Sequence, residues 1–218
     1  MASSGTYVWF PDGGDLLSEA FERAGMDPSS ISSRHALSAR TSLNYMFSDW
    51  QNDGIFEWKL VQKTHTVTTA EASFSLGTGE IDIIEAVLRR DSTDVTMIPI
   101  SRQEFSLIPN KTTDGRPDRY WVDRQLAPTV YYWPIAENST DQIIYWALMR
   151  FEEFSALQNT SDAPFQWQEA IVSGLAARLA LKYNVEKYQL LEALAGRAYQ
   201  RARVEDRNRG DVVLTISR

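Results

Sequence analysis

The side chains that could carry out catalysis or bind a metal ion are few in this sequence and lie far apart. There is no cysteine, so thiolate nucleophiles, disulfides and cysteine-based zinc sites are excluded, and the two imidazoles are His35 and His65. We expect His35, in a Ser- and Arg-rich helical segment, to be solvated or to cap the helix, and His65, among threonines, to lie on the surface. Glu152 and Glu153 are adjacent and would point to different faces of a helix, so they are poor acid–base partners.

Hydrolysis or group transfer requires a nucleophile with a base, a pair of carboxylates in a cleft, or a metal cluster. None of these occurs with diagnostic spacing, and the glycines of Gly77-Thr78-Gly79 are not followed by the lysine and helix start of a phosphate-binding loop. Carboxylates that are distant in sequence could still meet in the fold. The sequence therefore predicts a protein that is not an enzyme, with no catalytic residues, no metal site and no cofactor.

The segment from Arg116 to Phe151 has the densest aromatic content of the chain. Its aromatic and β-branched residues, separated by clusters of turn-forming residues, predict a meander of three strands over 120–122, 129–133 and 142–149. In a half-buried strand, apolar and polar residues alternate. Here both parities are apolar: one holds Tyr120, Val122, Val130 and Tyr132, and the other holds Trp121, Tyr131 and Trp133.

Both faces of these strands therefore need cover. Two interpretations remain open. The strands could form an ordinary sheet that is buried on both sides within one chain, or a neighbouring subunit could cover one side.

Composition limits the class of protein further. A chain of 218 residues with 43% hydrophobic content predicts one large domain or two small ones. No apolar run reaches the roughly 18 residues of a membrane helix, and Met1 to Gly14 lacks the order of a signal peptide, so we expect a soluble protein without a membrane partner.

The net charge of −7 argues against general binding to nucleic-acid backbones. From Arg197 onward six arginines face three acidic residues, a balance of +3, which leaves −10 for residues 1–196.

Apolar residues at helical spacing predict helices near both ends of the chain. They cover residues 15–24, with Gly25 as the C-terminal cap, then 29–50, 164–183 and 186–205. Ser101 and Glu104 form a capping box that begins a short helix through Leu107, and residues 152–158 predict a helical turn.

Between these helices the apolar pattern changes to the period of a strand. Phe56 to Leu60 and Thr64 to Thr69 predict strands, and two hairpins are expected, one joining 74–76 to 81–83 and one joining 84–88 to 95–98. Asp211 to Ile216 is a hydrophobic, strand-like end that we expect to add to another chain.

The predicted fold class is therefore α+β: N- and C-terminal helices form a bundle, an antiparallel β-rich domain is inserted between them, and an extended arm ends the chain. The expected boundaries are residues 1–55 for the N-terminal helical part, 56–149 for the β-rich domain, 150–205 for the C-terminal helices and 206–218 for the arm.

The order of these features resembles a known family, the head-to-tail adaptors of short-tailed bacteriophages, also called tail accessory or head-completion proteins. The resemblance covers nearly the whole chain and is one of order and composition. It rests on LSEAFERAG at 17–25, SARTSLN at 38–44 before DWQNDG at 49–54, Arg116-Pro117, YWVDR at 120–124 ahead of Thr129 to Pro134, and GLAARLA at 174–180. The match is weakest at residues 1–10 and at the Ile216 end.

The resemblance implies a structural protein of the virion neck that is assembled in the host cytoplasm. It implies a homo-oligomeric ring of twelve copies that binds the portal protein on one side and the tail nozzle or tail tube protein on the other. Double-stranded DNA would pass through the ring without sequence-specific binding and be retained there, and a body of charge −10 agrees with such a lumen.

A ring uses two different faces of each copy, which favours an interface on the aromatic strands. The residues expected at this subunit interface are Arg116, Arg119, Tyr120, Trp121, Tyr131 and Trp133. The residues expected on the portal-binding arm are Arg201, Arg203, Arg207, Arg209, Val212, Val213, Leu214 and Ile216.

A second hypothesis is a carbohydrate-binding or wall-degrading tail component, because exposed aromatic rings stack on sugars. Rings that line an exposed groove beside two carboxylates would favour this hypothesis, and buried rings would favour the connector.

Overall fold

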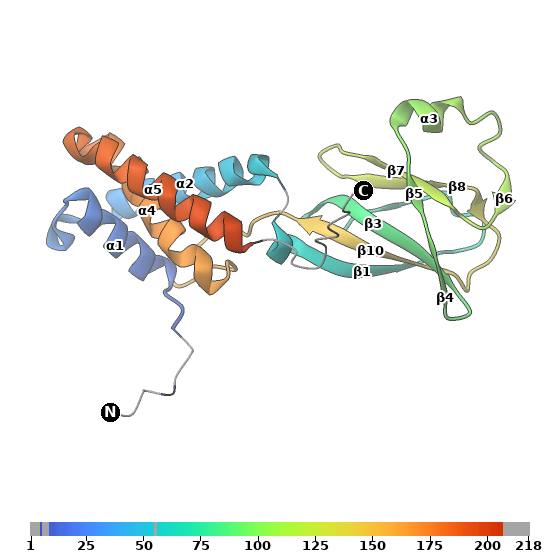
Figure 1. Ribbon diagram of the computed structural model, residues 1–218, viewed down its shortest axis with the longest axis horizontal. Coiled ribbons are helices and arrows are strands. Elements are labelled where there is room, and N and C mark those ends of the chain that lie inside the picture. The colour runs from blue at the N-terminus through green and yellow to red at the C-terminus, as the bar shows by residue number, and fades with distance from the viewer. Residues whose placement is uncertain (1–4, 6–8, 55, 207–218) are drawn as a thin grey trace, which may run out of the picture. The chain divides into compact units, whose positions relative to one another are not determined.

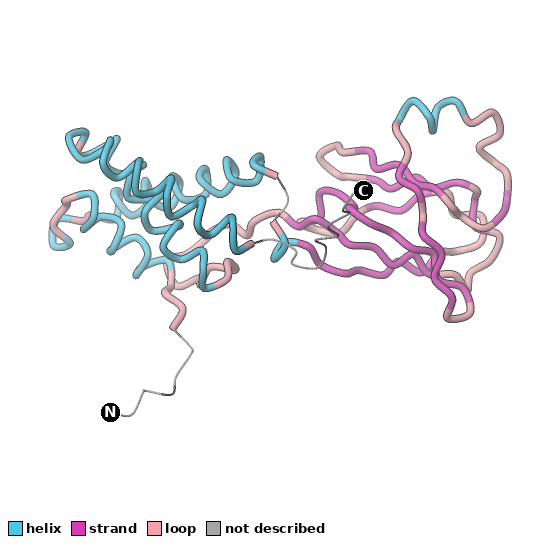
Figure 2. Tube along the Cα trace, in the orientation of Figure 1, coloured by secondary structure: helices cyan, strands magenta, loops and turns pink. Residues whose placement is uncertain are grey.

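The computed structural model describes residues 5, 9–54 and 56–206, and Figure 1 shows its elements. The chain divides into two compact units. A helical unit combines Met1–Trp58 with Phe151–Arg218, and a β unit consists of Lys59–Arg150. Helices at both ends of the chain and mostly antiparallel strands between them confirm the predicted α+β class (Figure 2).

Among its described residues, the helical unit has four α-helices: α1 (Gly13–Ala24), α2 (Ser33–Trp50), α4 (Gln168–Tyr183) and α5 (Val185–Glu205). Short 3-10 turns accompany them: η1 (Pro28–Ser30), η2 (Gln51–Asp53), η3 (Glu57–Lys59) and η4 (Phe165–Trp167). Helix α4 lies at the centre, in contact with α1, α2 and α5. Its line of Ile171, Leu175 and Leu179 is completely buried.

Local capping residues set the helix ends. Asp12 accepts a hydrogen bond from the Asp15 amide at 2.9 Å at the start of α1, and Gly25 ends α1 with φ +86°, a conformation that favours glycine. Helix α2 begins at Ser33, four residues after the predicted start at residue 29, because Pro28–Ser30 form a 3-10 turn. The Ser32 amide donates to Nδ1 of His35 at 3.2 Å, so the predicted capping role of His35 is confirmed.

Aromatic rings fill the region where the chain leaves the helical unit and returns to it. Phe56 is fully buried, and its ring centroid lies 5.1 Å from that of Phe151 and 5.2 Å from that of Trp167. The Trp58 ring meets the Phe151 ring edge-on at 5.0 Å. We name Phe56, Trp58, Phe151 and Trp167 the aromatic clasp. The predicted strand from Phe56 is therefore wrong: its apolar alternation reflects ring packing around a 3-10 turn, and the strand begins at Leu60.

The β unit has two four-stranded sheets. The first has the order β1-β10-β3-β4, with β1 (Leu60–Thr66), β3 (Glu80–Arg90), β4 (Thr93–Thr96) and β10 (Gln142–Met149). The second has the order β2-β8-β7-β5, with β2 (Ser73–Ser75), β5 (Ile98–Pro99), β7 (Arg119–Asp123) and β8 (Thr129–Trp133). The short strands β6 (Asp114–Gly115) and β9 (Ile135–Ala136) pair in parallel, and α3 spans Arg102–Leu107. The buried residues of both sheets form one apolar core.

Strand pairing differs from the sequence prediction in two places. The predicted hairpin of 74–76 with 81–83 is wrong, because β2 pairs with β8 and β3 pairs with β10 and β4, so Gly77-Thr78-Gly79 carries the chain from one sheet to the other. Likewise β10 does not continue the sheet of β7 and β8 but lies in the first sheet. The hairpin of β3 with β4 is confirmed; Asp91 and Ser92 turn it with positive φ.

Outside these elements, residues 152–158 do not form the predicted helical turn; they run as a bend and an isolated turn. The predicted capping box of α3 is confirmed, since Ser101 and Glu104 exchange hydrogen bonds of 2.7 and 3.1 Å.

A buried ion pair fixes the loop before β10. The Asp141 side chain is completely buried and accepts two hydrogen bonds from the Arg90 guanidinium, at 2.8 and 2.7 Å. Arg90 also pairs with Glu137 at 2.8 Å. Two parallel N–H···O bonds between a guanidinium and a carboxylate give fixed geometry as well as energy, so this contact ties the end of β3 to the start of β10.

We predict that Asp141→Asn lowers the free energy of unfolding by about 1.5 to 3 kcal/mol, because Arg90 loses its two charge-assisted hydrogen bonds to a completely buried carboxylate and keeps only its ion pair with Glu137. The matched control is Asp94→Asn, which breaks the exposed Arg89–Asp94 pair in the neighbouring hairpin and is expected to cost less than about 1 kcal/mol. Urea unfolding of both variants measures the difference. Equal losses for the two variants would contradict the role given to Asp141.

Candidate interaction surfaces

The second sheet of the β unit carries stacked aromatic rings on the side away from its core. Trp121 on β7 lies opposite Tyr131 on β8, and their rings stack with centroids 5.2 Å apart and planes 18° apart. Phe105 of α3 lies 5.6 and 5.8 Å from these two rings. All three side chains are only half-buried. Helix α3 therefore supplies part of the cover that this face needs, and the rest stays open within one copy.

Arg119 and Trp133 extend this surface toward an open pocket of about 480 Å³ next to α3. The Arg119 guanidinium lies 5.1 Å from the Trp133 ring centroid, and Nε1 of Trp133 donates to the Asn110 carbonyl at 2.9 Å. We name Phe105, Trp121, Tyr131, Arg119 and Trp133 the aromatic face. Arginine stacked on an aromatic ring is typical of residues that carry binding energy at protein interfaces.

Glu104 is the only carboxylate among the residues lining this pocket, all of which the structure describes. Hydrogen bonds from Ser101 lower the pKa of Glu104, which keeps it ionised as a helix cap. Glycoside hydrolysis needs two carboxylates, one of them protonated. The pocket therefore does not support that chemistry.

The other residues predicted at a subunit interface have different environments. Tyr120 is only 2% exposed because it packs between the two sheets, where burial raises its pKa to about 12. The Tyr120 side chain is therefore not accessible to a neighbouring copy, and its predicted place at the subunit interface is wrong. Arg116 is half-buried, and its Nε and Nη2 atoms are shielded from solvent with no acceptor among the described residues.

Two arginines predicted on the C-terminal arm belong to helix α5 instead. Arg201 is exposed on this helix. Arg203 packs its guanidinium over the Phe56 ring, 4.4 Å from the centroid, and lies 3.7 Å from the Asp206 carboxylate. The remaining predicted arm residues, Arg207, Arg209, Val212, Val213, Leu214 and Ile216, lie outside the described residues.

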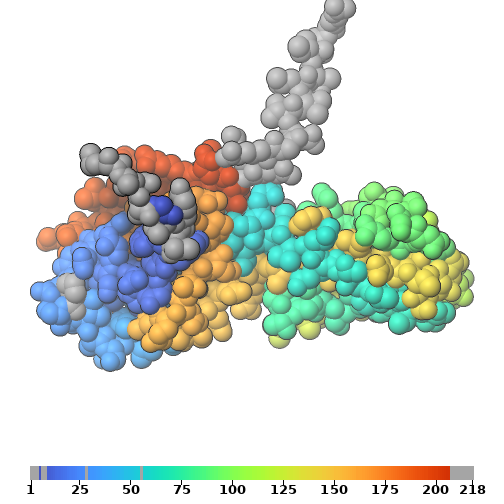
Figure 3. Space-filling model, turned by 90° about the horizontal axis from the view of Figure 1, so that it is seen from below, coloured from blue at the N-terminus to red at the C-terminus, as the bar shows by residue number. Residues whose placement is uncertain are grey.

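The helical unit has a groove of about 690 Å³ between α1 and the start of α4, which lie side by side in Figure 3. Trp9 and Phe165 stand over it with rings in edge-on contact at 6.4 Å, and both are about two-thirds exposed. Carboxylates line it, contributed by Asp15, Glu19, Glu22 and Glu169. The sequence analysis missed this groove. The recurrence of Asp15, Glu19 and Glu22 on one helix face was its only signal, and nothing in the sequence places Glu169 beside them.

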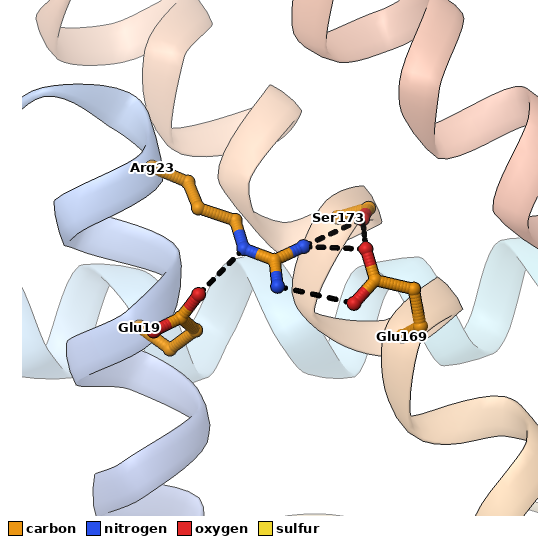
Figure 4. Close-up of polar contacts among 4 residues, drawn as sticks. All are labelled: Glu19, Arg23, Glu169 and Ser173. Atoms are coloured by element: carbon orange, nitrogen blue, oxygen red, sulfur yellow. Dashed lines mark hydrogen bonds and ion pairs between the residues drawn. The ribbon is translucent and has the colours of Figure 1, made fainter.

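Arg23 joins the two helices across one side of the groove (Figure 4). Its Nη1 and Nη2 atoms donate to the Glu169 carboxylate at 2.6 and 3.0 Å, its Nε atom donates to Glu19 at 2.7 Å, and Nη1 also lies 3.0 Å from the Ser173 hydroxyl. The hydrogen bond from Arg23 lowers the pKa of Glu169 below its usual range. One guanidinium thus holds two of the four carboxylates.

Comparison with known families decides the identity of the chain. A sequence model of the SU10 adaptor protein family matches residues 14–215. The chain belongs to this family. The match confirms the resemblance to phage head-to-tail adaptors, and the adaptor is a structural protein of the bacteriophage virion. A comparison with curated proteins gives no match.

Two further findings concern the described part of the adaptor. None of its helices is long and apolar enough to cross a membrane. Within the same residues, no three His, Cys, Asp or Glu side chains are grouped so that they could hold a metal ion.

We predict that Glu169→Gln destabilises the adaptor at pH 7 by about 1 kcal/mol, a value limited by the exposure of the pair, and that the difference disappears in acid. The pKa of Glu169 is lowered in the folded state, so its contribution is present above the unfolded pKa and is lost as the pH falls through the folded value. Urea unfolding followed by circular dichroism at neutral and acidic pH measures this.

The control is Glu153→Gln in the same unit, an exposed carboxylate for which no ion pair is found among the described residues. It is expected to change stability little at either pH. A loss for Glu169→Gln that is the same at both pH values would show that the carboxylate acts through packing and not through its charge.

Proposed function

We propose that the adaptor forms a ring in the virion neck, joins the portal to the tail nozzle or tail tube, and helps to retain or pass the packaged DNA. The observation that supports this most is the aromatic face, a group of large, half-exposed rings on a structural protein of a phage adaptor family. Contiguous exposed apolar surface on a stable domain marks an interaction site. A ring of identical copies covers such a face in every copy, and we propose twelve copies.

The contacts of the aromatic face suit a protein partner better than a sugar. Trp121 and Tyr131 stack on each other, so each covers a ring face that a sugar would need. We therefore favour the connector over the carbohydrate-binding alternative.

The net charge of the chain and the residues of its pocket agree with a ring through which DNA passes without being bound tightly or cleaved. Residues 1–196 carry −10, so their field does not favour adhesion of DNA that passes through the ring. The pocket beside the aromatic face lacks the carboxylate pair of a hydrolase. We propose that the adaptor is not an enzyme, that it contacts DNA without reading its sequence, and that residues 206–218 form an arm that docks on the portal.

We predict that the purified adaptor, mixed with the portal protein of the same phage, forms rings on the portal that electron microscopy can count. Deletion of Asn208 to Arg218 removes the basic and apolar end of the chain. It should leave the circular dichroism spectrum unchanged and abolish portal binding. A native chain that stays monomeric in the mixture would disprove the proposed function, and a deleted chain that still binds would disprove the arm.

We predict that Trp121→Ala reduces the fraction of adaptor in rings at least about tenfold, since removal of a central aromatic anchor commonly costs 2 kcal/mol or more at an interface. The matched control is Trp146→Ala, which truncates a tryptophan that is 41% exposed on the first sheet. Sedimentation of each variant with the portal measures ring formation. Equal effects of the two truncations would argue against the aromatic face as a subunit interface.

A further inference from the structure

Helix α5 carries an exposed stripe that is both apolar and basic. Leu190 and Leu194 are 65% and 44% exposed, and Arg197 and Arg201 continue the same line toward the C-terminus. The spacing of four, three and four residues places all four side chains on one helix face, away from the packed face that includes Leu191 and Ala202. We name these four residues the α5 stripe. In the described part of the chain, neither arginine of the stripe has an ion-pair partner.

The groove between α1 and α4 has the complementary character. Trp9 and Phe165 give it exposed apolar surface. Its four carboxylates face one guanidinium, that of Arg23, which leaves a balance of −3. Arg23 holds Glu19 and Glu169, whereas Asp15 and Glu22 are exposed and form no ion pair with any residue that the structure describes. The groove thus has two carboxylates without a cation, and the α5 stripe has two cations without a carboxylate.

Gln168 adds an observation that does not depend on charge. This groove-lining residue is only 4% exposed. Its Nε2 atom donates to the Ala163 carbonyl at 3.2 Å, but its Oε1 atom is shielded from solvent and has no donor among the described residues. A buried acceptor without a donor is unfavourable, and a guanidinium presents five N–H donors in a planar fork. An arginine side chain that enters the groove would supply the hydrogen-bond donor that the Oε1 atom of Gln168 lacks.

We propose that the groove of one adaptor copy receives the α5 stripe of a second copy. This inference rests on the proposed ring, in which every copy uses two different faces for its two neighbours. A second copy is the occupant because each copy carries both halves of the contact: Leu190 and Leu194 would pack on Trp9 and Phe165, and Arg197 and Arg201 would meet Asp15 and Glu22. The helical units, and not only the β units, would then hold the ring together.

Charge reversal tests the contact. The groove variant is Glu22→Lys, which places a cation in the last turn of α1, where the helix dipole tolerates it. The stripe variant combines Arg197→Glu with Arg201→Glu. Each variant, mixed with the portal, should form rings about tenfold less well than the native chain, because like charges then face each other. The chain that carries all three substitutions should recover ring formation. The control is Arg34→Glu, an exposed arginine in the first turn of α2, which should assemble like the native chain.

The outcomes separate this inference from the proposed function. If the native chain forms rings and the variants assemble equally well, the ring stands and the groove contact is disproved. Failure of the triple variant to recover also disproves the contact, because two unrelated defects would simply add.

If the native chain forms no ring, cysteine cross-linking of the adaptor without the portal tests whether the groove of one copy contacts the α5 stripe of another. The native chain has no cysteine, so E22C mixed with R201C at high concentration reports on this contact without background. A thiol-specific cross-linker should join these two variants but should not join E22C to R34C. No E22C–R201C product, or equal yields in the two mixtures, would overturn the inference.

Discussion

The aromatic clasp is the contact on which the rest of the structure depends. The helical unit is made from two segments of chain that are separated in sequence by the whole β unit, and they must meet before either can bury its apolar face. Phe56 comes from the first segment, Phe151 and Trp167 come from the second, and their rings are in edge-on contact. Each such pair adds about 0.5 to 1.5 kcal/mol beyond the burial of its area. Bringing the two ends of the β unit together costs chain entropy, and the ring contacts at these ends offset part of that cost.

Around the clasp, helix α4 can touch three other helices because its own surface is small. Ala170, Ala176, Ala177 and Ala180 are almost completely buried, and a side chain on Gly174 would approach the Met46 sulfur to 2.6 Å. Close packing on all sides leaves the charged residues of α1 and α5 at the periphery. The same arrangement that stabilises the helical unit therefore exposes an acidic groove between α1 and α4 and a basic stripe on α5.

The sequence predicted the helices far better than the sheets, for a physical reason. Helix ends depend on neighbours in sequence, such as Ser101 with Glu104, and this capping box could be recognised directly. Strand partners depend on residues far away, and the alternation of side chains does not state which sheet a strand joins. The strands β2, β3 and β10 were predicted, but β2 was wrongly paired with β3, and β10 was wrongly placed in the sheet of β7 and β8. The two apolar parities of 120–133 were read correctly as two apolar faces. The sequence does not show which of the two faces packs in the core. In the structure Tyr120 and Tyr132 are buried between the two sheets, so their face is the core face.

The β unit also has a feature that bears on how such adaptors can vary. Its first strand, β1, and its last, β10, are hydrogen-bonded neighbours, with Leu60 opposite Leu148. The residues just outside them, Trp58 and Phe151, touch within the clasp. The chain thus enters and leaves the β unit at adjacent points, as in a domain inserted into a host loop. Related adaptors could therefore exchange, lengthen or recombine the β unit, while the helical unit keeps its core and the two points at which the β unit is attached.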